Sequence, residues 1–384
     1  MRQSRIFFAF CLLLLFSCRS AKTGGGKDDG IIEVVFLHLN DVYEISPLSD
    51  DSGGLARVAA IRQSLKAKNP NTYTLLAGDF ISPSVIATLR HEGKRIRGRH
   101  MVDVLNTLGV DAVIFGNHEF DYDYEDLQAR LNESDFPWLG TNLRLVQGDS
   151  VVGPFFKQRP GGQREACPDY KIVEFTDADG TRLRVGLWGV TVTVNQKPYV
   201  RYENPLDAAQ RMYEALRGQC DVQVGLTHLD IEDDLKLAAR LPGVPLILGG
   251  HDHDNMLHKV GPTTVAKADA NARTVYVHRL RYDKRKGTAQ VRSELRRIDG
   301  SLPEEPNTAS VVAKWEKIKE DALKSAGFDA RAKVVSLTTP LDCREALIRH
   351  QQAPVGQIIL EAMLAAAREK PECALLNSGS IRVD

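Results

Sequence analysis

The sequence predicts an α/β fold in which β-sheets are flanked by helices, and three observations support this. Short apolar runs alternate with amphipathic stretches between residue 31 and about residue 297. The apolar runs are short and rich in β-branched residues, which favours buried strands over helices. The 384 residues, 43% of them hydrophobic, suffice for one large core and the start of another. This alternation is typical of a layered α/β domain.

The elements follow one another in a regular order along the chain. The runs that we predict to be strands are Val34–Leu39, Tyr73–Ala77, Ala112–Phe115, Leu183–Val190, Val222–Leu226 and Leu246–Leu248. The stretches that we predict to be helices are Leu55–Lys68, Met101–Leu108, Leu206–Arg217 and Asp233–Leu241. Gly109 suits the C-terminal cap of the second helix, and Pro242 ends the fourth. The proline- and glycine-rich segment Gly153–Pro168 is predicted to be a surface loop or small insertion.

The N-terminus is predicted to be an export signal covering residues 1–20. Basic residues precede the apolar run Ile6–Phe16, which is too short to span a bilayer because a spanning helix needs about 20 residues. The segment Leu15–Cys18 resembles a bacterial lipobox, in which Cys18 would carry a lipid; the alternative is ordinary cleavage near Ala21. Residues 21–30 suit a flexible tether. We expect a protein of the periplasm or cell surface whose only membrane contact would be such a lipid anchor.

The charge balance excludes recruitment of nucleic acid by a global electrostatic field. The chain holds 50 Lys plus Arg and 50 Asp plus Glu. An anionic substrate must therefore be held by local charge, from metal ions or a few arginines. Outside the signal segment the cysteines are widely spaced and none shows CxxC metal spacing, so the sequence does not set any disulfide pairing. They are Cys167, Cys220, Cys343 and Cys373.

Polar residues that can bind a metal ion follow five of the six predicted strands. They are Asn40-Asp41, Gly78-Asp79, Gly116–Asp121, Thr227-His228 and Gly249–His253. Taken singly, a Gly-Asp pair is usually a turn and a lone histidine is usually a hydrogen-bonded core or surface residue. Ligands of open α/β sheets gather at the carboxyl ends of strands, so these groups can converge. Five of them in order, each behind an apolar run, indicate one metal site.

The chemistry of these residues suits phosphate esters. Asp, Asn and His are ligands for Zn²⁺, Mn²⁺ or iron, and two ions about 3.5–4 Å apart can bridge a phosphate and activate a water. A single carboxylate such as Asp79 can span both ions, and the neutral amide of Asn117 adds a ligand without adding charge. Asp121 is close enough in sequence to orient His118, a pair that suits transition-state stabilisation or protonation of the leaving oxygen.

These motifs resemble those of the calcineurin-like metallophosphoesterases, and Asn117–Asp121 points to the 5′-nucleotidase branch of that family. The similarity runs from about Val35 to the last residue. The resemblance implies two divalent metal ions, the first held by Asp41, Asp79 and His253. It implies that the second is held by Asp79, Asn117, His228 and His251. It also implies that His118 and Asp121 form the catalytic dyad.

One residue departs from the resembled pattern inside the predicted metal site. The first motif of the family is usually Asp-x-His, whereas this chain has Tyr43 two residues after Asp41. A neutral phenol is a poor ligand for a divalent ion, but a phenolate is a good ligand for Fe³⁺. Two interpretations stay open: iron occupies the site with Tyr43 bound, or Tyr43 packs nearby and water or another group fills the position.

The C-terminal part predicts the beginning of a second α/β domain. We expect the catalytic domain to cover residues 31–300, a linker with the helix Ala309–Ala326 to cover residues 301–333, and the new domain to cover residues 334–384. Pro354–Gly356, which opens the predicted helix Gln357–Arg368, and Asn377–Arg382 resemble the start of the 5′-nucleotidase C-terminal domain. The resemblance implies four substrate-binding residues, namely Arg349, Asn377, Gly379 and Arg382.

The second domain is expected to be incomplete. In the resembled family the aromatic pair that stacks on the base lies further along this domain, and some fifty residues can hardly form an independent core. Base stacking is worth about 1–3 kcal/mol per base, so its absence would reduce nucleoside selectivity. The simplest explanation is an incomplete record of a longer protein, and the alternative is a genuine truncation.

These residues predict hydrolysis of nucleoside 5′-phosphates by metal-activated water. A second interpretation keeps the metal site and changes the substrate to cyclic nucleotides, other phosphomonoesters or a sulfur ester, since metal ligands do not separate these. A third is an inactive surface binding protein, which Tyr43 alone supports. The sequence predicts a small-molecule partner and leaves the native metal and the oligomeric state open.

Overall fold

The computed structural model describes residues 28–329, 332–333, 335–369 and 371–381, which fall into two compact units. The first unit ends at Ala326 and the second begins at Gly327. The predicted signal segment with Cys18, and residues 21–27 of the predicted tether, lie outside the described residues. No helix in the described part of the chain combines the length and the apolar character that a membrane span requires.

The first unit is built on two six-stranded sheets. The first sheet has the strand order β19-β18-β1-β2-β5-β6. Its parallel strands are β1 (Ile31–Leu39), β2 (Thr72–Leu76), β5 (Ala112–Ile114) and β6 (Trp138–Leu139), and β18 (Thr274–Asp283) and β19 (Thr288–Arg297) extend it in antiparallel fashion. Three of the predicted strands therefore lie side by side in one parallel sheet.

The second sheet has the order β11-β12-β14-β15-β17-β16. Its parallel strands are β12 (Arg182–Thr191), β14 (Val222–His228), β15 (Leu246–Gly249) and β17 (Thr263–Lys267), and the antiparallel edge strands are β11 (Tyr170–Thr176) and β16 (Met256–Val260). It contains the other three predicted strands. The α/β prediction is thereby confirmed for the first unit.

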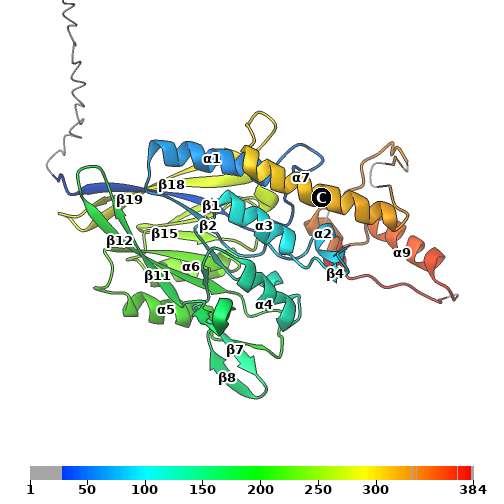
Figure 1. Cartoon of the computed structure of the whole chain (residues 1–384), viewed down its shortest axis with the longest axis horizontal. Helices are drawn as coiled ribbons and strands as arrows, with labels where there is room; N and C mark the ends of the chain where they lie inside the picture. Colours follow the sequence, from blue (N-terminus) through cyan, green and yellow to red (C-terminus); the bar gives the residue numbers. More distant parts are fainter. Residues whose placement is uncertain (1–27, 330–331, 334, 370, 382–384) are drawn as a thin grey trace, which may run out of the picture. The chain divides into compact units, whose positions relative to one another are not determined.

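Helices cover the outer faces of the two sheets (Figure 1). The first sheet is covered by α1 (Leu55–Lys68), α3 (Arg99–Leu108), α4 (Tyr124–Glu133) and α7 (Pro306–Ser325), and the second by α5 (Pro205–Ala215) and α6 (Ile231–Arg240). Successive residues of a strand face opposite sides of its sheet. Val34 and Phe36 accordingly pack in the core between the sheets, whereas Val35 and Leu37 pack in the core beneath the helices.

Smaller elements complete the first unit. They are α2 (Val85–Thr88), β3 (Arg90–His91), β4 (Lys94–Arg95), β7 (Leu143–Gln147), β8 (Ser150–Gly153), β9 (Phe156–Gln158), β10 (Arg164–Ala166) and β13 (Val200–Tyr202). The segment predicted as a loop or small insertion contains the two-stranded sheet β9–β10. It is anchored inside the unit because the buried Lys157 donates hydrogen bonds to the carbonyls of Ser134 and Phe136, at 2.8 and 2.6 Å.

The helix predicted inside the linker, α7, packs within the first unit. Its Trp315 is 1% exposed and belongs to the same core as α1 and α3. The indole Nε1 donates to the carboxylate of Asp103 on α3, at 2.8 Å. Burial of this tryptophan makes residues 306–325 part of the first unit rather than of a free connection.

The described residues of the second unit bury few side chains. This unit contains α8 (Glu345–Ile348), α9 (Pro354–Ala366) and a 3₁₀ turn at Ser378–Ser380. No residue of α9 is buried, and its Ile358 is 50% exposed. The predicted helix is confirmed with its start three residues earlier, at Pro354, whose fixed φ suits the first turn of a helix.

A pair of buried histidines supports the loop that follows β15. His38 on β1 and His278 on β18 are fully buried, with ring centroids 5.7 Å apart. His38 Nε2 donates to the carbonyl of Gly249, at 3.0 Å, and thereby joins the two sheets where β15 ends. Burial lowers the pKa of His38 to about 3 and holds the pKa of His278 well below its usual value.

Acidification should therefore destabilise the fold through this pair. The folded-state pKa of each histidine lies below the unfolded value of about 6.5, so the unfolded chain binds more protons and stability falls as pH drops below that value. We expect a loss of about 2 kcal/mol per histidine at pH 5. In urea unfolding at pH 7.5 and 5.0, His278→Leu should lose about 2 kcal/mol less than the wild type between the two pH values.

The control for this experiment is His258→Leu, because His258 is exposed. The stability of this variant should change with pH as that of the wild type does. An unchanged pH dependence in His278→Leu would contradict the prediction.

Candidate metal centre

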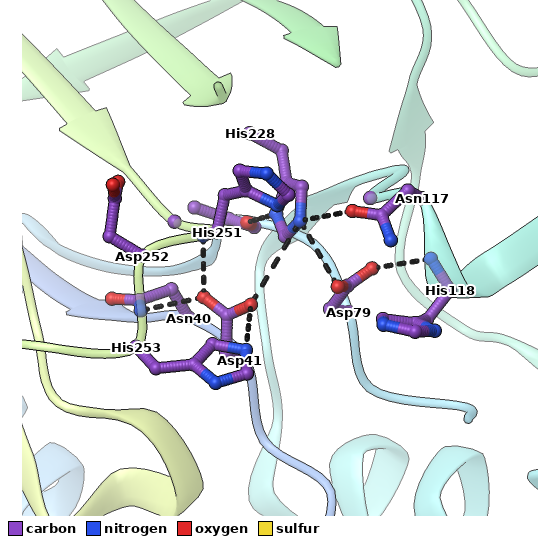
Figure 2. Close-up of polar contacts among 12 residues, drawn as sticks. Asn40, Asp41, Asp79, Asn117, His118, His228, His251, Asp252 and His253 are labelled. Carbon is purple, nitrogen blue, oxygen red and sulfur yellow. Dashed lines mark hydrogen bonds and ion pairs between the residues drawn. The ribbon is translucent and has the colours of Figure 1, made fainter. Parts of the chain in front are cut away.

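All six predicted metal ligands meet where the central strands of the two sheets end (Figure 2). Asp41, Asp79 and Asn117 follow β1, β2 and β5, while His228 is the last residue of β14 and the other two histidines follow β15. The backbone turns sharply there, because four of the six have positive φ although none is glycine. They are Asp41 (52°), Asp79 (57°), His251 (86°) and His253 (67°). Such strained residues persist where the surrounding structure holds them, often at functional sites.

The glycine that precedes Asp79 is required by its surroundings. Gly78 has φ 82°, and a Cβ there would lie 2.7 Å from His228 Nδ1 and 2.8 Å from the backbone of Gly116. A side chain at this position would push apart the loops that carry three of the ligands. The Gly-Asp motif thus reflects close packing of backbones at the site.

His228 presents one ring nitrogen to two oxygen atoms. Its Nδ1 donates to the carbonyl of Ala77, at 2.8 Å, so that Nε2 carries the lone pair in the neutral ring. Nε2 lies 3.1 Å from Asp79 Oδ2 and 3.2 Å from Asn117 Oδ1. Three electron-pair donors facing one another require a cation or a proton between them.

The electrostatics of His228 lead to the same conclusion. Burial lowers its pKa, but the charges of Asp79 and Asp41 outweigh burial and raise the pKa to about 10. Ligand atoms of Asp41, Asp79 and His228 all lie within 4.8 Å of one another. The donor set therefore fits a metal ion chemically, since carboxylate, amide and imidazole are suitable ligands for a divalent transition metal.

The two carboxylates are oriented by backbone N–H groups. Asp41 Oδ2 accepts from the N–H of His251, at 2.8 Å, and its Oδ1 lies 3.4 Å from His253 Nε2. Asp79 Oδ1 accepts from the N–H of His118, at 2.7 Å. Its Oδ2 therefore remains directed toward the predicted ligands of the two ions. Burial raises the pKa of Asp41, but the neighbouring imidazoles of His228 and His253 outweigh it and lower the pKa overall. Asp79 is thus placed to bridge two ions.

His251, a predicted ligand of the second ion, lies beside His228. The ring of His251 is 5.1 Å from that of His228, centroid to centroid, and its Nε2 is 3.5 Å from Asp230 Oδ1. Burial lowers the pKa of His251, and the charge of His228 adds to this effect. The arrangement places His251 on the side of the centre where the second ion is predicted.

The hydroxyl group of Tyr43 lies among the predicted ligands of the first ion. The side chain is buried, and its oxygen is 3.0 Å from His253 Nε2, 3.2 Å from Asp79 Oδ2 and 3.3 Å from Asp41 Oδ1. Of the two interpretations left open by the sequence, the placement of this oxygen favours direct participation in the site over packing nearby.

The two residues of the predicted dyad are hydrogen-bonded. His118 Nδ1 donates to Asp121 Oδ2, at 2.8 Å. The same carboxylate also accepts from the hydroxyl of Ser82, at 2.8 Å, and from the amide of Asn195, at 2.9 Å. Asn195 further donates to the carbonyl of Asn117, at 2.9 Å, which couples the dyad to a metal ligand. Ser82 and Asn195 were missed by sequence reasoning, because Asn195 lies in a loop beyond β12 that has no motif.

A buried glutamate joins the loops after β2 and β5. Glu119 Oε2 accepts from the N–H groups of Gly116 and Asp79, at 2.6 and 2.9 Å. Its Oε1 accepts from those of Phe80 and Ile81, at 2.8 and 3.3 Å. Burial, with a contribution from Asp79, raises the pKa of Glu119 to about 7. The adjoining Asn117 and His118 were the signal that could have identified this residue.

A buried lysine joins the loops after β14 and β15. Lys267 Nζ donates to the carbonyls of Leu229 and Gly250, at 2.5 and 2.9 Å, and forms ion pairs with Asp234 and Asp252. Burial lowers its pKa, but the two carboxylates outweigh burial and raise the pKa overall. The positive charge thus fixes the backbone on either side of His228 and His251. A single lysine in β17 carries no sequence signal for this role.

The second unit brings together three of its four predicted substrate residues. Arg349 lines a pocket of ≈ 730 Å³ that is formed by α9 and neighbouring segments of the second unit. Asn377 accepts from the N–H of Gly379 through its side chain, at 3.1 Å, and so shapes the turn before Ile381. A Cβ at Gly379 would lie 3.6 Å from the guanidinium of Arg349. Arg382 lies outside the described residues.

The cysteines left unassigned by the sequence are free thiols. Cys167 and Cys343 are buried, Cys220 is half-buried and Cys373 is exposed. Burial raises the pKa of the Cys167 thiol to about 12. A thiol becomes a reactive nucleophile in accessible, electropositive surroundings, and burial denies these to Cys167 and Cys343.

Comparison with known proteins identifies the family. The sequence model described as calcineurin-like phosphoesterase matches residues 34–255. The chain is 26% identical over 388 residues to the trifunctional nucleotide phosphoesterase protein YfkN of Bacillus subtilis, which covers 92% of this chain. It is 24% identical over 399 residues to the 5′-nucleotidase of Bos taurus, which covers 91% of this chain. The chain spans 25% and 64% of the length of these two relatives.

Solved structures support the fold. The 5′-nucleotidase precursor of Thermus thermophilus superimposes with a TM-score of 0.69 at 22% identity, covering 87% of this chain and 67% of that chain. The calcineurin-like phosphoesterase YfkN of Bacillus subtilis gives a TM-score of 0.62 at 18% identity, covering 77% of this chain and 99% of that chain.

Glu119→Gln should destabilise the protein by about 2–4 kcal/mol, because an amide NH₂ cannot accept the two N–H groups that one carboxylate oxygen accepts. Glu125→Gln is the matched control, since Glu125 is exposed on α4 and should change stability by less than about 0.5 kcal/mol. Denaturant unfolding of both variants measures the effect. Equal unfolding midpoints for Glu119→Gln and the wild type would contradict the role given to Glu119.

Proposed function

As this chain belongs to the calcineurin-like phosphoesterase family and is a phosphoric ester hydrolase, we propose that it releases phosphate from nucleoside 5′-phosphates. The observation that carries the proposal is the convergence of the six predicted metal ligands and an oriented histidine at one end of two sheets (Figure 2), with ligand atoms of Asp41, Asp79 and His228 within 4.8 Å of one another. The relative from Bos taurus is named a 5′-nucleotidase, and it resembles nearly the whole of this chain.

We propose that Asp41, Asp79 and His253 hold the first metal ion and that Asp79, Asn117, His228 and His251 hold the second. The ions, when bound, supply Lewis-acid chemistry, which neutralises charge on the phosphate and makes a water more acidic. The protein supplies the direction of each ligand: Ala77 orients His228, and the N–H of His118 orients Asp79. These contacts support the assignment because they hold the ligand atoms toward a common centre.

His118 is proposed to interact with the substrate through Nε2. Its Nδ1–H is held by Asp121, and this carboxylate is fixed in turn by Ser82 and Asn195. The ring is thereby prevented from rotating, and its second nitrogen can stabilise charge on the phosphoryl group or deliver a proton to the leaving oxygen. Asp121 is a positioning residue in this scheme.

The second unit is proposed to bind the nucleotide. A pocket of ≈ 730 Å³ lies in the range of about 300–1,000 Å³ that small-molecule sites occupy. Arg349 contributes a positive charge that suits a phosphate or ribose, and Pro354 and Leu376 contribute apolar surface that suits a base. Asn377, Gly379 and Arg382 complete the proposed set of substrate residues.

We also propose that the protein is exported to the periplasm or cell surface. The basic residues and the apolar run of residues 1–20 support an export signal, and the segment that ends at Cys18 supports a lipid anchor. Mass spectrometry of the mature N-terminus tests both: an unmodified terminus beyond Cys18 would rule out the anchor.

Phosphate release is expected to be faster from 5′-AMP than from an aryl phosphate. Hydrolysis of 5′-AMP is also expected to be faster than hydrolysis of 3′,5′-cyclic AMP, which is followed through the formation of AMP because opening the cyclic diester releases no phosphate. The assay contains added Mn²⁺ or Zn²⁺, and a chelator should abolish the activity. Hydrolysis of either of the other two esters at a rate equal to or above that of 5′-AMP would contradict the proposed substrate and favour the alternative substrates. No hydrolysis of any ester by metal-loaded protein would favour the inactive binding protein.

His118→Ala should lower kcat by about 10²–10⁴-fold, because it removes the group that acts on the phosphoryl or leaving oxygen. The metal content should stay that of the wild type, since the imidazole is not among the proposed ligands. Exposed His258→Ala is the control and should keep the wild-type kcat. Loss of metal in His118→Ala, measured by mass spectrometry of the elements, would contradict this separation of roles.

A further inference from the structure

We propose that Tyr43 is a ligand of the first metal ion, so that a phenol oxygen completes this position together with Asp41, Asp79 and His253. The inference rests on the proposed two-metal function and goes beyond it, because it assigns a phenol ligand where the resembled family usually has a histidine. It also has a consequence for which ions the position accepts.

Four of the six distances between the proposed ligand atoms match a coordination shell. Metal bonds of about 2.0–2.2 Å place neighbouring ligand atoms about 2.8–3.6 Å apart in octahedral or tetrahedral geometry. The Tyr43 oxygen lies 3.0, 3.2 and 3.3 Å from His253 Nε2, Asp79 Oδ2 and Asp41 Oδ1. Asp41 Oδ1 and His253 Nε2 are 3.4 Å apart. All four separations fall in the expected range.

The single proton of the Tyr43 hydroxyl does not bridge this oxygen to both carboxylates. The phenol of Tyr43 has one proton, which it can donate to only one of the carboxylates of Asp41 and Asp79. The other carboxylate oxygen then faces the phenol oxygen at 3.2 or 3.3 Å without a proton between them. Both aspartates are buried. A cation at the centre satisfies all of these atoms at once.

The backbone and neighbouring rings hold Tyr43 in this direction. Asn271 Oδ1 accepts from the N–H groups of Tyr43 and Glu44, at 3.0 and 3.2 Å, and the N–H of Asn271 donates to the carbonyl of Asp41, at 2.8 Å. The phenol ring stands edge-on to the rings of His118 and His253, with centroids 6.1 and 5.6 Å away. The hydroxyl is thus directed at the ligand cluster by contacts on both sides.

Coordination by Tyr43 changes the charge of the first position. As a ligand, Tyr43 would supply its oxygen as a phenolate, with the hydroxyl proton released to solvent. The phenolate would add a third negative charge to those of Asp41 and Asp79. The second position has only Asp79 as a charged ligand, with neutral Asn117, His228 and His251. The first position should therefore favour a trivalent ion such as Fe³⁺, and the second a divalent ion.

Metal binding by the purified full chain and three variants tests the inference. The protein is stripped with a chelator, reloaded with Fe³⁺ followed by Zn²⁺, and analysed for metal per chain and for visible absorption. Wild type should retain two ions and show a phenolate-to-Fe³⁺ charge-transfer band. Tyr43→Phe should lack the band and bind the first ion at least about tenfold more weakly. Tyr43→His should retain two Zn²⁺ ions without the band, which shows that the variant folds and that the position needs a ligand.

Tyr73→Phe is the matched control, because Tyr73 is 9% exposed against 8% for Tyr43 and its hydroxyl bonds to the carbonyl of Asp111, away from the site. It should keep the metal content and the spectrum of the wild type. Tyr43→Phe with two ions of wild-type affinity and an unchanged spectrum would overturn the inference. Another outcome is binding of Zn²⁺ that depends on Tyr43, without any affinity for Fe³⁺. This result would support Tyr43 as a metal ligand and overturn the preference for a trivalent ion.

The outcome is separable from that of the proposed function. Metal binding that depends on Tyr43, without hydrolysis of 5′-AMP, would support the ligand and contradict the substrate. Full hydrolysis of 5′-AMP by Tyr43→Phe with two bound ions would support the proposed substrate and contradict the assignment of Tyr43 as a ligand. A wild-type protein that binds no metal would overturn both.

Discussion

Burial of two carboxylates at the ends of neighbouring parallel strands is the constraint on which the rest of the site depends. Asp41 and Asp79 lie in the protein interior, where an uncompensated charge costs several kcal/mol. The structure surrounds them with the imidazoles of His228 and His253 and with directed N–H groups. This arrangement is stable when cations balance the charge. The backbone has positive φ at both aspartates, a strained geometry that persists where the surrounding structure holds it.

The loops that carry the ligands are held by buried ionisable groups that touch neither metal nor substrate in the proposed scheme. Glu119 gathers four N–H groups from the loops after β2 and β5, and Lys267 gathers two carbonyls from the loops after β14 and β15. His38 adds a bond from the first sheet to the last residue of β15. Each sheet therefore fixes its own loops, and the packed core between the sheets sets the distance across the centre.

The proposed division of labour follows from burial. Four of the proposed metal ligands, Asp41, Asp79, Asn117 and His228, are buried, whereas His118 and Asp121 are partly exposed, where a substrate can reach them. Tyr43 stands between the two, in contact with the ligand atoms of the first ion and beside the ring of His118. The second unit buries few of its own side chains, and its pocket carries Arg349 as a charged group suited to a nucleotide. Specificity and chemistry are thus assigned to different parts of the chain.

Much of the site could be predicted from sequence because its signals are local. Apolar runs followed two residues later by Asp79, Asn117 or His228 indicate both a buried strand and the polar group at its end, and Gly109 marks a helix end through its own φ. Only the tertiary structure decided what depends on distance between segments far apart in the chain. The burial of Trp315 drew α7 into the first unit, Lys267 and Asn195 became supports through contacts across loops, and the oxygen of Tyr43 was placed among three ligands. Sequence patterns report which residues are buried and where strands end, whereas packing of the two sheets determines which atoms meet.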